Sequence, residues 1–295
     1  MNTTPYGKLS RITGWIYVLP ALVFFIVFML FPIIYNIINS VSLSSSESFF
    51  ANYITLFHDS TFIIALQNSI IWVFFTTLMQ MVIGFVLAIL LERRIARGRV
   101  VFRTILFLPM AITPTVIALV FNNLYAPQYG LLFGLFQQFG LAANFPSLLS
   151  DPHYATYALM AISIWQWLGF YVLMYSVGVA NIDGELLDAA DLDGASGWSR
   201  IRYIYFPLLR SSHLSLFILG ALQALQQFPL IYLMTEGGPA NSTQVLATYI
   251  FQKGFMENQM QYASAISVVL LLLALVIAGI QIIGTRGDFS IGGGE

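Results

Sequence analysis

Amide side chains form the most suggestive ligand-binding set in this chain. Gln223, Gln226 and Gln227 follow an i, i+3, i+4 spacing, which predicts that they share one face of a helix. Burying three amides against apolar surroundings is costly, so this face is expected to meet protein or a watery cavity. Two interpretations stay open, namely contact with a polar ligand and hydrogen bonding between helices.

Aromatic rings and further amides lie in other uncharged segments. Trp167, Phe170 and Tyr171 offer ring faces that suit the C–H surface of a polyhydroxylated ligand. Aromatic residues at helical spacing also serve in packing or in an interfacial belt, and that alternative stays open. The candidate residues for a ligand path are Gln223, Gln226, Gln227, Trp165, Gln166, Asn122 and Asn123.

Several kinds of chemistry are excluded by what the chain lacks. It has no cysteine, which rules out thiol catalysis, disulfides and thiolate metal sites. Its only lysines, Lys8 and Lys253, lie outside any glycine-rich phosphate loop, so the chain has no Walker A site. The formal net charge of −1 removes nucleic acid as an expected partner, because no overall basic field attracts it.

The elements that carry these residues are predicted to be membrane-spanning helices. Of the 295 residues, 58% are hydrophobic and 8% are charged, against about a quarter charged in soluble domains. Each uncharged segment exceeds the roughly 20 residues that a helix needs to cross the hydrocarbon layer, and lipid demands internally paired backbone. We therefore expect an all-α membrane protein with six transmembrane helices. Uncharged segments cover 12–46, 60–91, 104–150, 154–182, 211–235 and 258–285.

The distribution of basic residues predicts the orientation. Eleven of the twelve lie before the first span, in the second and fourth connections or after the sixth span, and only Lys253 falls on the other side. Because cytoplasmic loops are enriched in Lys and Arg, both termini are expected to be cytoplasmic. The predicted organisation is an N-terminal tail (1–14), a six-helix transmembrane domain (15–285) and a C-terminal tail (286–295). The expected helices cover 15–38, 64–91, 104–125, 155–180, 208–235 and 262–285.

The middles of the predicted spans carry no Asp, Glu, Lys or Arg. Carriers driven by ion gradients usually place ionisable groups there, so coupling to an ion gradient is the weaker hypothesis. A sodium site built from backbone carbonyls would escape this test. His213 lies near the cytoplasmic end of the fifth predicted span, and we prefer a structural role for it over a proton relay.

The fourth connection, residues 181–207, is predicted to form two short helices joined by a tight turn. Asp183 suits an N-cap, and Gly194 can end the first helix because glycine tolerates a left-handed backbone. Ser196 is expected to cap a second helix through Tyr205, and Pro207 fits the first turn of the fifth span.

One interpretation of this connection is an amphipathic hairpin that rests on lipid headgroups. In that interpretation Arg200 and Arg202 lie near anionic lipid. A second interpretation follows from the small residues Ala189, Ala190 and Ala195 around the turn, which let another backbone approach closely.

The spacing of this connection resembles the cytoplasmic signature loop of permease subunits in bacterial ATP-binding-cassette (ABC) importers. That pattern is Glu-Ala-Ala, two variable residues, Asp-Gly-Ala, and about eleven residues to Leu-Pro. Here 188–190 read Asp-Ala-Ala, 193–195 read Asp-Gly-Ala, and Phe206-Pro207 closes the pattern. The departures are Asp188 for Glu, Ile201 for Phe and Phe206 for Leu. Asp188 keeps the charge of glutamate but has a shorter reach.

A second segment is similar to a pattern of carbohydrate-type permeases, the maltose and multiple-sugar group. It reads Gly-Gly-Pro at 237–239, Ser-Thr at 242–243, Leu246 and Tyr-Ile at 249–250. This resemblance implies a type I importer permease fold in a bacterial inner membrane, one of two permease subunits of a binding-protein-dependent sugar importer. Alternatives are a glycerol-phosphate importer, an ion-coupled carrier and a non-transport membrane scaffold.

The resemblance also implies partners. They are a second homologous permease, a dimer of cytoplasmic ABC ATPases, an extracytoplasmic sugar-binding protein and membrane lipid. The chain itself would hold no cofactor and would not be an enzyme, because ATP and Mg²⁺ bind to the ATPase. The 183–205 hairpin would dock in a groove of that ATPase. The expected coupling residues are Glu185, Asp188, Ala189, Ala190, Asp193, Gly194, Ala195 and Pro207.

Overall fold

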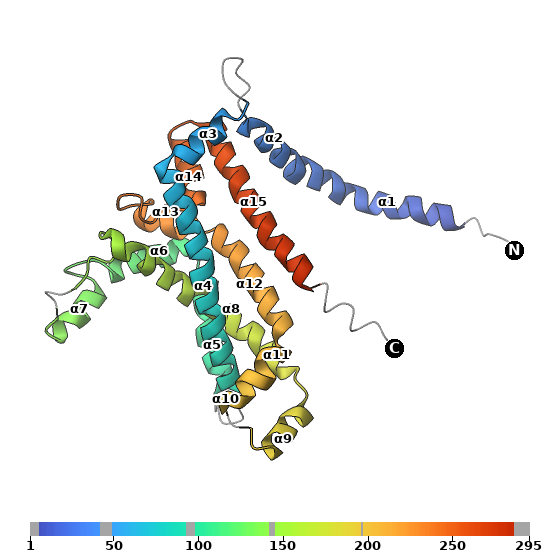
Figure 1. Ribbon diagram of the computed structural model, residues 1–295, viewed down its shortest axis with the longest axis vertical. Helices are drawn as coiled ribbons and strands as arrows, with labels where there is room; N and C mark the ends of the chain where they lie inside the picture. The colour runs from blue at the N-terminus through green and yellow to red at the C-terminus, as the bar shows by residue number, and fades with distance from the viewer. Residues whose placement is uncertain (1–5, 42–48, 93–97, 142–144, 196, 286–295) are drawn as a thin grey trace. The chain divides into compact units, whose positions relative to one another are not determined.

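The computed structural model describes residues 6–41, 49–92, 98–141, 145–195 and 197–285, and within these ranges it contains helices and no strand. The chain divides into two compact units. One comprises residues 1–58 and 250–269, and the other comprises 59–249 and 270–295. Figure 1 labels the helices of both units.

The first unit begins with a long apolar helix. α1 (Tyr6–Phe25), the π-helical turn η1 (Ile26–Leu30) and α2 (Phe31–Ser40) run on from one another. Within them Trp15–Ser40 forms a candidate span with mean hydropathy 2.7, and none of its most apolar window is buried. α3 (Ala51–His58) follows, and the Tyr53 hydroxyl lies 2.7 Å from the Ser40 hydroxyl. η5 (Gln252–Met256) and the start of α15 (Met260–Thr285) complete this unit.

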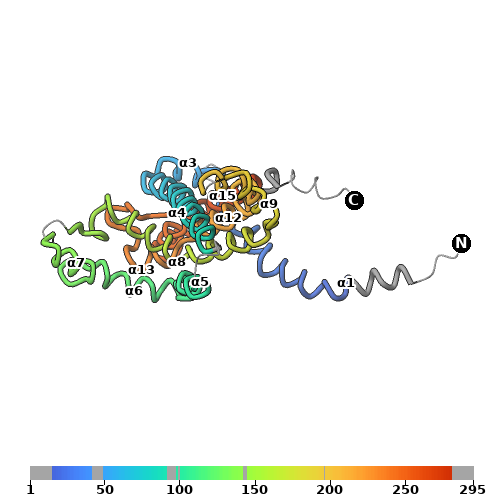
Figure 2. Tube along the Cα trace, turned by 90° about the horizontal axis from the view of Figure 1, so that it is seen from below, coloured from blue at the N-terminus to red at the C-terminus, as the bar shows by residue number. Residues whose placement is uncertain are grey.

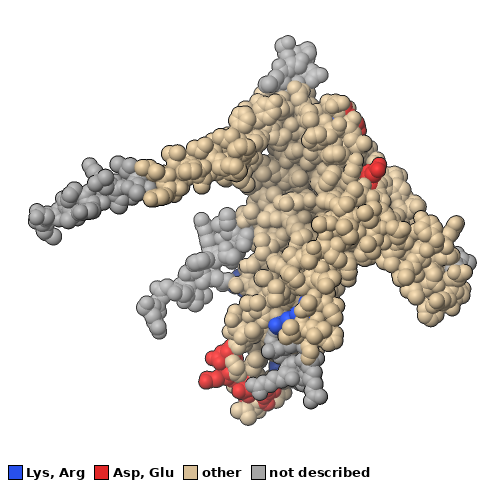
Figure 3. All heavy atoms as spheres, turned by 180° about the vertical axis from the view of Figure 1, so that it is seen from behind, with Lys and Arg blue, Asp and Glu red and all other residues tan. Residues whose placement is uncertain are grey.

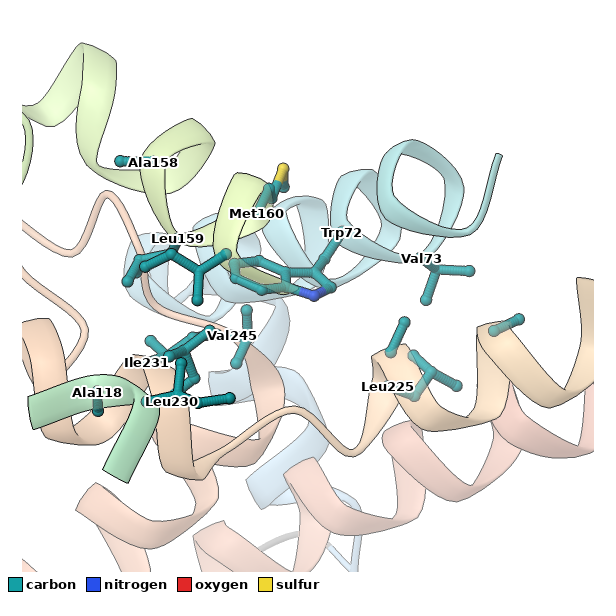
Figure 4. Close-up of a cluster of buried hydrophobic side chains, with 14 of the residues drawn as sticks. Trp72, Val73, Ala118, Ala158, Leu159, Met160, Leu225, Leu230, Ile231 and Val245 are labelled. Atoms are coloured by element: carbon teal, nitrogen blue, oxygen red, sulfur yellow. The ribbon is translucent and has the colours of Figure 1, made fainter. Parts of the chain in front are cut away.

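The second unit is built on three helices that pack together. α4 (Ser60–Glu92) lies along α8 (Pro152–Ala180), and α12 (Arg210–Leu225) packs on α4. The buried side chains of Trp72, Leu159, Met160 and Leu225 belong to the apolar cluster between these helices (Figure 4). Ile231 joins the same cluster from α13 (Pro229–Thr235), which contacts α6 (Pro114–Leu124).

The third predicted span, 104–125, is not a continuous helix. α5 (Arg99–Phe107) and the 3₁₀ turn η2 (Leu108–Ala111) are bent by 98° from α6. Thr113 has extended backbone (φ −64°, ψ 145°), as expected for a residue before proline, and Pro114 cannot donate the hydrogen bond that a continuous helix needs. Figure 2 shows α6 and then α7 (Leu131–Gln138) extending away from α5.

The fifth predicted span, 208–235, is also interrupted. The helical segment that leads into it, Gly197–Leu208, is bent by 71° from α12, so the span itself begins at the bend. α12 ends at Leu225, and α13 begins at Pro229, which occupies a first-turn position. The continuous helix predicted through residue 235 is therefore wrong, because Pro229 starts a new helix after a non-helical Phe228 (φ −127°, ψ −55°).

Six spans are recovered only when each bent pair counts as one span. Within the part of the chain that the structure describes, four continuous helices are long and apolar enough to cross a membrane, and the two bent pairs raise that number to six. The cytoplasmic placement of the termini stays a prediction. Residues 1–5 and 286–295 lie outside the described ranges, and α1 already begins at Tyr6, within the predicted tail 1–14.

Candidate functional site

The fourth connection folds as a helical hairpin, as predicted. In its first arm, α9 (Gly184–Leu192), the Asp183 carboxylate caps the helix by accepting from the Glu185 backbone N–H at 3.0 Å. Gly194 has φ +73°, and the Ala195 N–H donates to the Ala190 carbonyl at 2.9 Å. This pattern is a helix end with a left-handed glycine, so the predicted turn is confirmed.

The second arm runs through α10 (Gly197–Arg200), the π-helical turn η4 (Ile201–Tyr205) and α11 (Phe206–Leu208). The predicted cap Ser196 lies outside the described residues. Pro207 lies in the first turn of α11, ahead of the 71° bend. The arm therefore reaches the fifth span through a bend.

Arg200 ties the two arms together. Its guanidinium forms an ion pair with Asp191 of the first arm, and its Nε donates to the Ala195 carbonyl at 3.1 Å. The sequence indicated Arg200 only as a lipid-facing cation and did not single out Asp191. The sequence did contain a signal for this ion pair, because it places a basic residue in the second arm close to the acidic residues of the first arm. The charge of Arg200 is directed inward, across the turn, and this fixes the hairpin.

The hairpin presents an exposed surface with both acidic and apolar side chains. Leu192 is 90% exposed and Trp198 is 72% exposed. Such large apolar side chains at one tip mark an interaction surface, because leaving them in water is unfavourable. Of the expected coupling residues, Ala190 is buried, Ala195 is half-buried, and the others are exposed, namely Glu185, Asp188, Ala189, Asp193, Gly194 and Pro207.

Acidic side chains gather at the hairpin end of the second unit, with a few basic side chains just above them and a broad, mostly uncharged surface beyond (Figure 3). They are supplied by the first arm of the hairpin, which carries Glu185, Asp188 and Asp191. This surface can attract a basic groove on a partner through electrostatic complementarity.

A cavity lies between α8 and α12 and has a volume of about 210 Å³. Trp167, Phe170 and Tyr171 line it from α8, and Leu219, Gly220 and Gln223 line it from α12. Aromatic rings with a single amide suit a neutral ligand that offers C–H faces and hydroxyl groups.

The three glutamines do not share a helix face. Gln223 lies in the last turn of α12, whereas Gln226 follows the end of the helix and is exposed. Gln227 is buried, with 7% exposure. The Gln226 and Gln227 N–H groups donate to the residues three positions before them, at 3.2 Å each, so the backbone leaves the α-helix there. The predicted shared face is wrong for this reason.

The other predicted path residues lie apart from the cavity. Gln166 is 2% exposed and donates from Nε2 to the Ile112 carbonyl at 3.3 Å, next to the break before α6. Trp165 is 42% exposed and its ring lies 5.3 Å from that of Phe121. Asn122 donates to the Leu233 carbonyl at 3.4 Å, and Asn123 donates to the Leu119 carbonyl at 2.9 Å. Whether these residues contact a ligand stays a prediction.

Comparison with known proteins identifies the family of the chain. Residues 80–286, which include the hairpin and the cavity, match the family described as binding-protein-dependent transport system inner membrane component. The chain belongs to this family. It is therefore a multi-pass inner-membrane permease subunit of an ABC transporter, and its family is not enzymatic.

Individual relatives extend this result along most of the permease. It is 34% identical to the probable ABC transporter permease protein YurN of Bacillus subtilis, over 92% of this chain and 95% of YurN. It is 29% identical to the lactose transport system permease protein LacF of Rhizobium radiobacter, over 97% of this chain and 99% of LacF. The permease fold is similar to that of a chain in a crystal structure of a bacterial alginate ABC transporter in complex with an alginate pentasaccharide-bound periplasmic protein. That match has a TM-score of 0.85 and 22% identity, and covers 96% of this chain and 98% of the other.

The Gly-Gly-Pro segment of the permease is held by side chains that the sequence did not reveal. Asn68 of α4 donates to the carbonyls of Ser242 and Gln244 at 2.8 and 2.9 Å. Thr156 of α8 donates to the Ser242 carbonyl at 2.7 Å, and the Ser69 hydroxyl accepts from the Leu246 N–H at 2.9 Å. These contacts join positions more than 80 residues apart, so no local pattern could indicate them.

Proposed function

We propose that this permease is one of two transmembrane subunits of an ATP-driven importer for a neutral sugar or oligosaccharide. An external binding protein delivers the ligand, and a dimer of ABC ATPases carries ATP and Mg²⁺ on the cytoplasmic side. The observation that carries this proposal is the capped hairpin with exposed Leu192 and Trp198 at its tip. The similarity to a lactose permease supports a sugar as substrate.

The hairpin provides a rigid connection between an ATPase and the spans. Its two arms are tied by Arg200 and Asp191, and its second arm continues into α12 through the 71° bend. Movement of a docked ATPase therefore moves the bend and, with it, the α12 wall of the cavity. Alternating access follows when ATP binding opens the path outward and hydrolysis resets it inward.

The substrate class is supported by the chemistry of the cavity. Its lining has three aromatic side chains and one amide, and contains neither lysine nor arginine. A glycerol phosphate, the nearest alternative substrate, would gain from a cation or a helix N-terminus along its path. A neutral sugar needs only ring faces and hydrogen bonds, which these residues supply.

Uptake by the complete complex in proteoliposomes tests the proposal. The external binding protein is first screened for ligands among neutral sugars and glycerol 3-phosphate by its thermal shift. We expect a neutral sugar to bind, and its uptake to require ATP on the ATPase side. Uptake should persist when ionophores collapse the proton and sodium gradients. Uptake that stops with the gradients while ATP remains would show an ion-coupled carrier instead.

We expect Gln223→Leu to raise the apparent KM for uptake of that sugar by roughly two- to tenfold, since one hydrogen bond contributes about 0.5–1.5 kcal/mol. The matched control is Gln137→Leu, on the exposed side of α7, which should leave uptake unchanged. Initial rates over a range of sugar concentrations give both values. If Gln223→Leu reduces only the amount of assembled complex, Gln223 has a structural role.

A further inference from the structure

A cluster of contacting side chains joins the hairpin to the spans of the second unit. We use "the junction" for Phe85, Tyr175, Phe206, Leu209 and His213, which come from α4, α8, α11, the bend and α12. Tyr175, Leu209 and Phe85 are buried, His213 is half-buried, and Phe206 is 58% exposed. The junction lies where the second arm of the hairpin turns into α12.

His213 contacts three other elements at the junction. Its Nδ1 lies 2.7 Å from the Tyr175 hydroxyl of α8. Its ring lies 4.7 Å from the Phe206 ring at the end of the hairpin and 5.3 Å from the Phe85 ring of α4, measured between centroids. One side chain on α12 therefore connects the hairpin with both α4 and α8.

The bend itself is also packed against α8. The His213 N–H donates to the Leu209 carbonyl at 2.9 Å, which begins α12 directly at the bend. Leu209 in turn lies against Gly178, where an added Cβ would come within 2.7 Å of the Leu209 side chain. The hairpin end consequently has little room to move independently of α8.

Burying the imidazole of His213 at this position is energetically less favourable than burying a phenyl ring would be. Its Nε2 is buried and has no hydrogen-bond partner among the residues that the structure describes. A buried polar atom left unpaired is unfavourable by about 1–3 kcal/mol, which a phenylalanine avoids. What the imidazole adds is polar contact with two elements, namely the hydrogen bond between Nδ1 and the Tyr175 hydroxyl of α8 and an interaction with the backbone of Phe206 at the end of the hairpin.

We propose that His213 is a positioning residue, whose hydrogen bond to Tyr175 transmits movement of the hairpin to α8. Tyr175 lies one helical turn beyond Tyr171, which lines the cavity together with Trp167 and Phe170 of the same helix. Displacement of the hairpin thus reaches the α8 wall of the cavity as well as the α12 wall. This inference rests on the proposed function, in which an ATPase moves the hairpin.

A single reporter cysteine can measure this transmission, because the chain has no cysteine of its own. Leu219→Cys places a thiol in the lining of the cavity. The whole complex, in lipid nanodiscs, is treated with N-ethylmaleimide with and without a non-hydrolysable ATP analogue and Mg²⁺. The labelling rate of this chain is followed on a gel. In the otherwise unaltered complex, nucleotide should change that rate.

Tyr175→Phe and His213→Phe each remove the hydrogen bond and keep a ring. We expect either change to reduce the nucleotide response at least about fivefold, the lower range of coupling between sites, while ATP hydrolysis continues. The double variant should lose no more of the nucleotide response than either single variant does. His213→Asn, which can still hydrogen-bond Tyr175, should recover part of the response. The matched control, Tyr125→Phe, removes a hydroxyl that donates to the Ala158 carbonyl at 3.3 Å, and should respond normally.

The outcomes separate this inference from the proposed function. If the unaltered complex shows no nucleotide response, coupling through the hairpin is wrong and the inference falls with it. If the unaltered complex responds and both phenylalanine variants respond equally well, the inference alone is overturned. A loss in Tyr125→Phe as large as in Tyr175→Phe would also overturn it, because any lost hydroxyl would then have the same effect.

Discussion

Gly194→Val should abolish most ATP-driven uptake while the permease still inserts into the membrane. Gly194 has φ +73°, a left-handed conformation that costs a side-chain-bearing residue about 1–2 kcal/mol and is worst for a β-branched one. An added Cβ meets no atom within 4 Å, so the change does not disturb the interior of the chain. It acts on the turn and on the exposed surface that we assign to the ATPase.

We expect uptake to fall at least about tenfold, which corresponds to about 1.4 kcal/mol. The measurements are sugar uptake in proteoliposomes and the amount of ATPase that copurifies with the permease. Gly194→Asn should be milder, because asparagine tolerates the left-handed backbone better than valine.

Gly140→Val is the matched control for this substitution. Gly140 also has positive φ, +72°, and an added Cβ there likewise meets nothing within 4 Å. It follows α7, away from the hairpin, so the same strain should leave uptake nearly unchanged. Normal uptake by Gly194→Val, or an equal loss in the control, would contradict docking at the hairpin turn.

Gly169→Ala should produce the largest loss of stability among single-methyl additions. An alanine Cβ at this position in α8 would clash with the Leu106 carbonyl and would lie 2.6 Å from the Phe107 Cα. Both atoms belong to the backbone of α5, which cannot relieve the clash by a change of rotamer as a side chain can. The two helices must separate, and overpacking of this kind costs about 1–3 kcal/mol.

The measurement is thermal unfolding of the purified permease complex in detergent, with Gly279→Ala as the control. Gly279 lies inside α15, and an added Cβ there meets nothing within 4 Å. Its replacement should leave stability unchanged or raise it by up to about 1 kcal/mol through helix propensity. If Gly169→Ala unfolds at the same temperature as Gly279→Ala, α5 and α8 do not approach each other as closely as described.

Local patterns in the sequence predicted much of the fold. Long uncharged segments predicted the spans, because a helix is the form that satisfies its own backbone in lipid. Asp183 and Gly194 predicted the hairpin, since caps and left-handed turns depend on residues that are neighbours in the chain. The family resemblance rested on the same local segment.

Breaks within the predicted helices were harder to place. Pro114 and Pro229 are each compatible with a kinked continuous helix or with a new helix, and the sequence alone does not distinguish these cases. In the structure a new helix begins at each of these prolines, and packing against neighbouring helices determines this outcome. Gln223, Gln226 and Gln227 consequently lost their predicted common face.

By itself, the sequence determined the helical class, the number of apolar segments and the capped hairpin, because each depends on residues close together in the chain. The tertiary structure decided the bends, the Arg200–Asp191 ion pair, the contacts that hold residues 242–246 and the junction at His213. These features depend on which faces of distant helices meet. The meeting of helix faces is set by packing over the whole unit, which no single segment encodes.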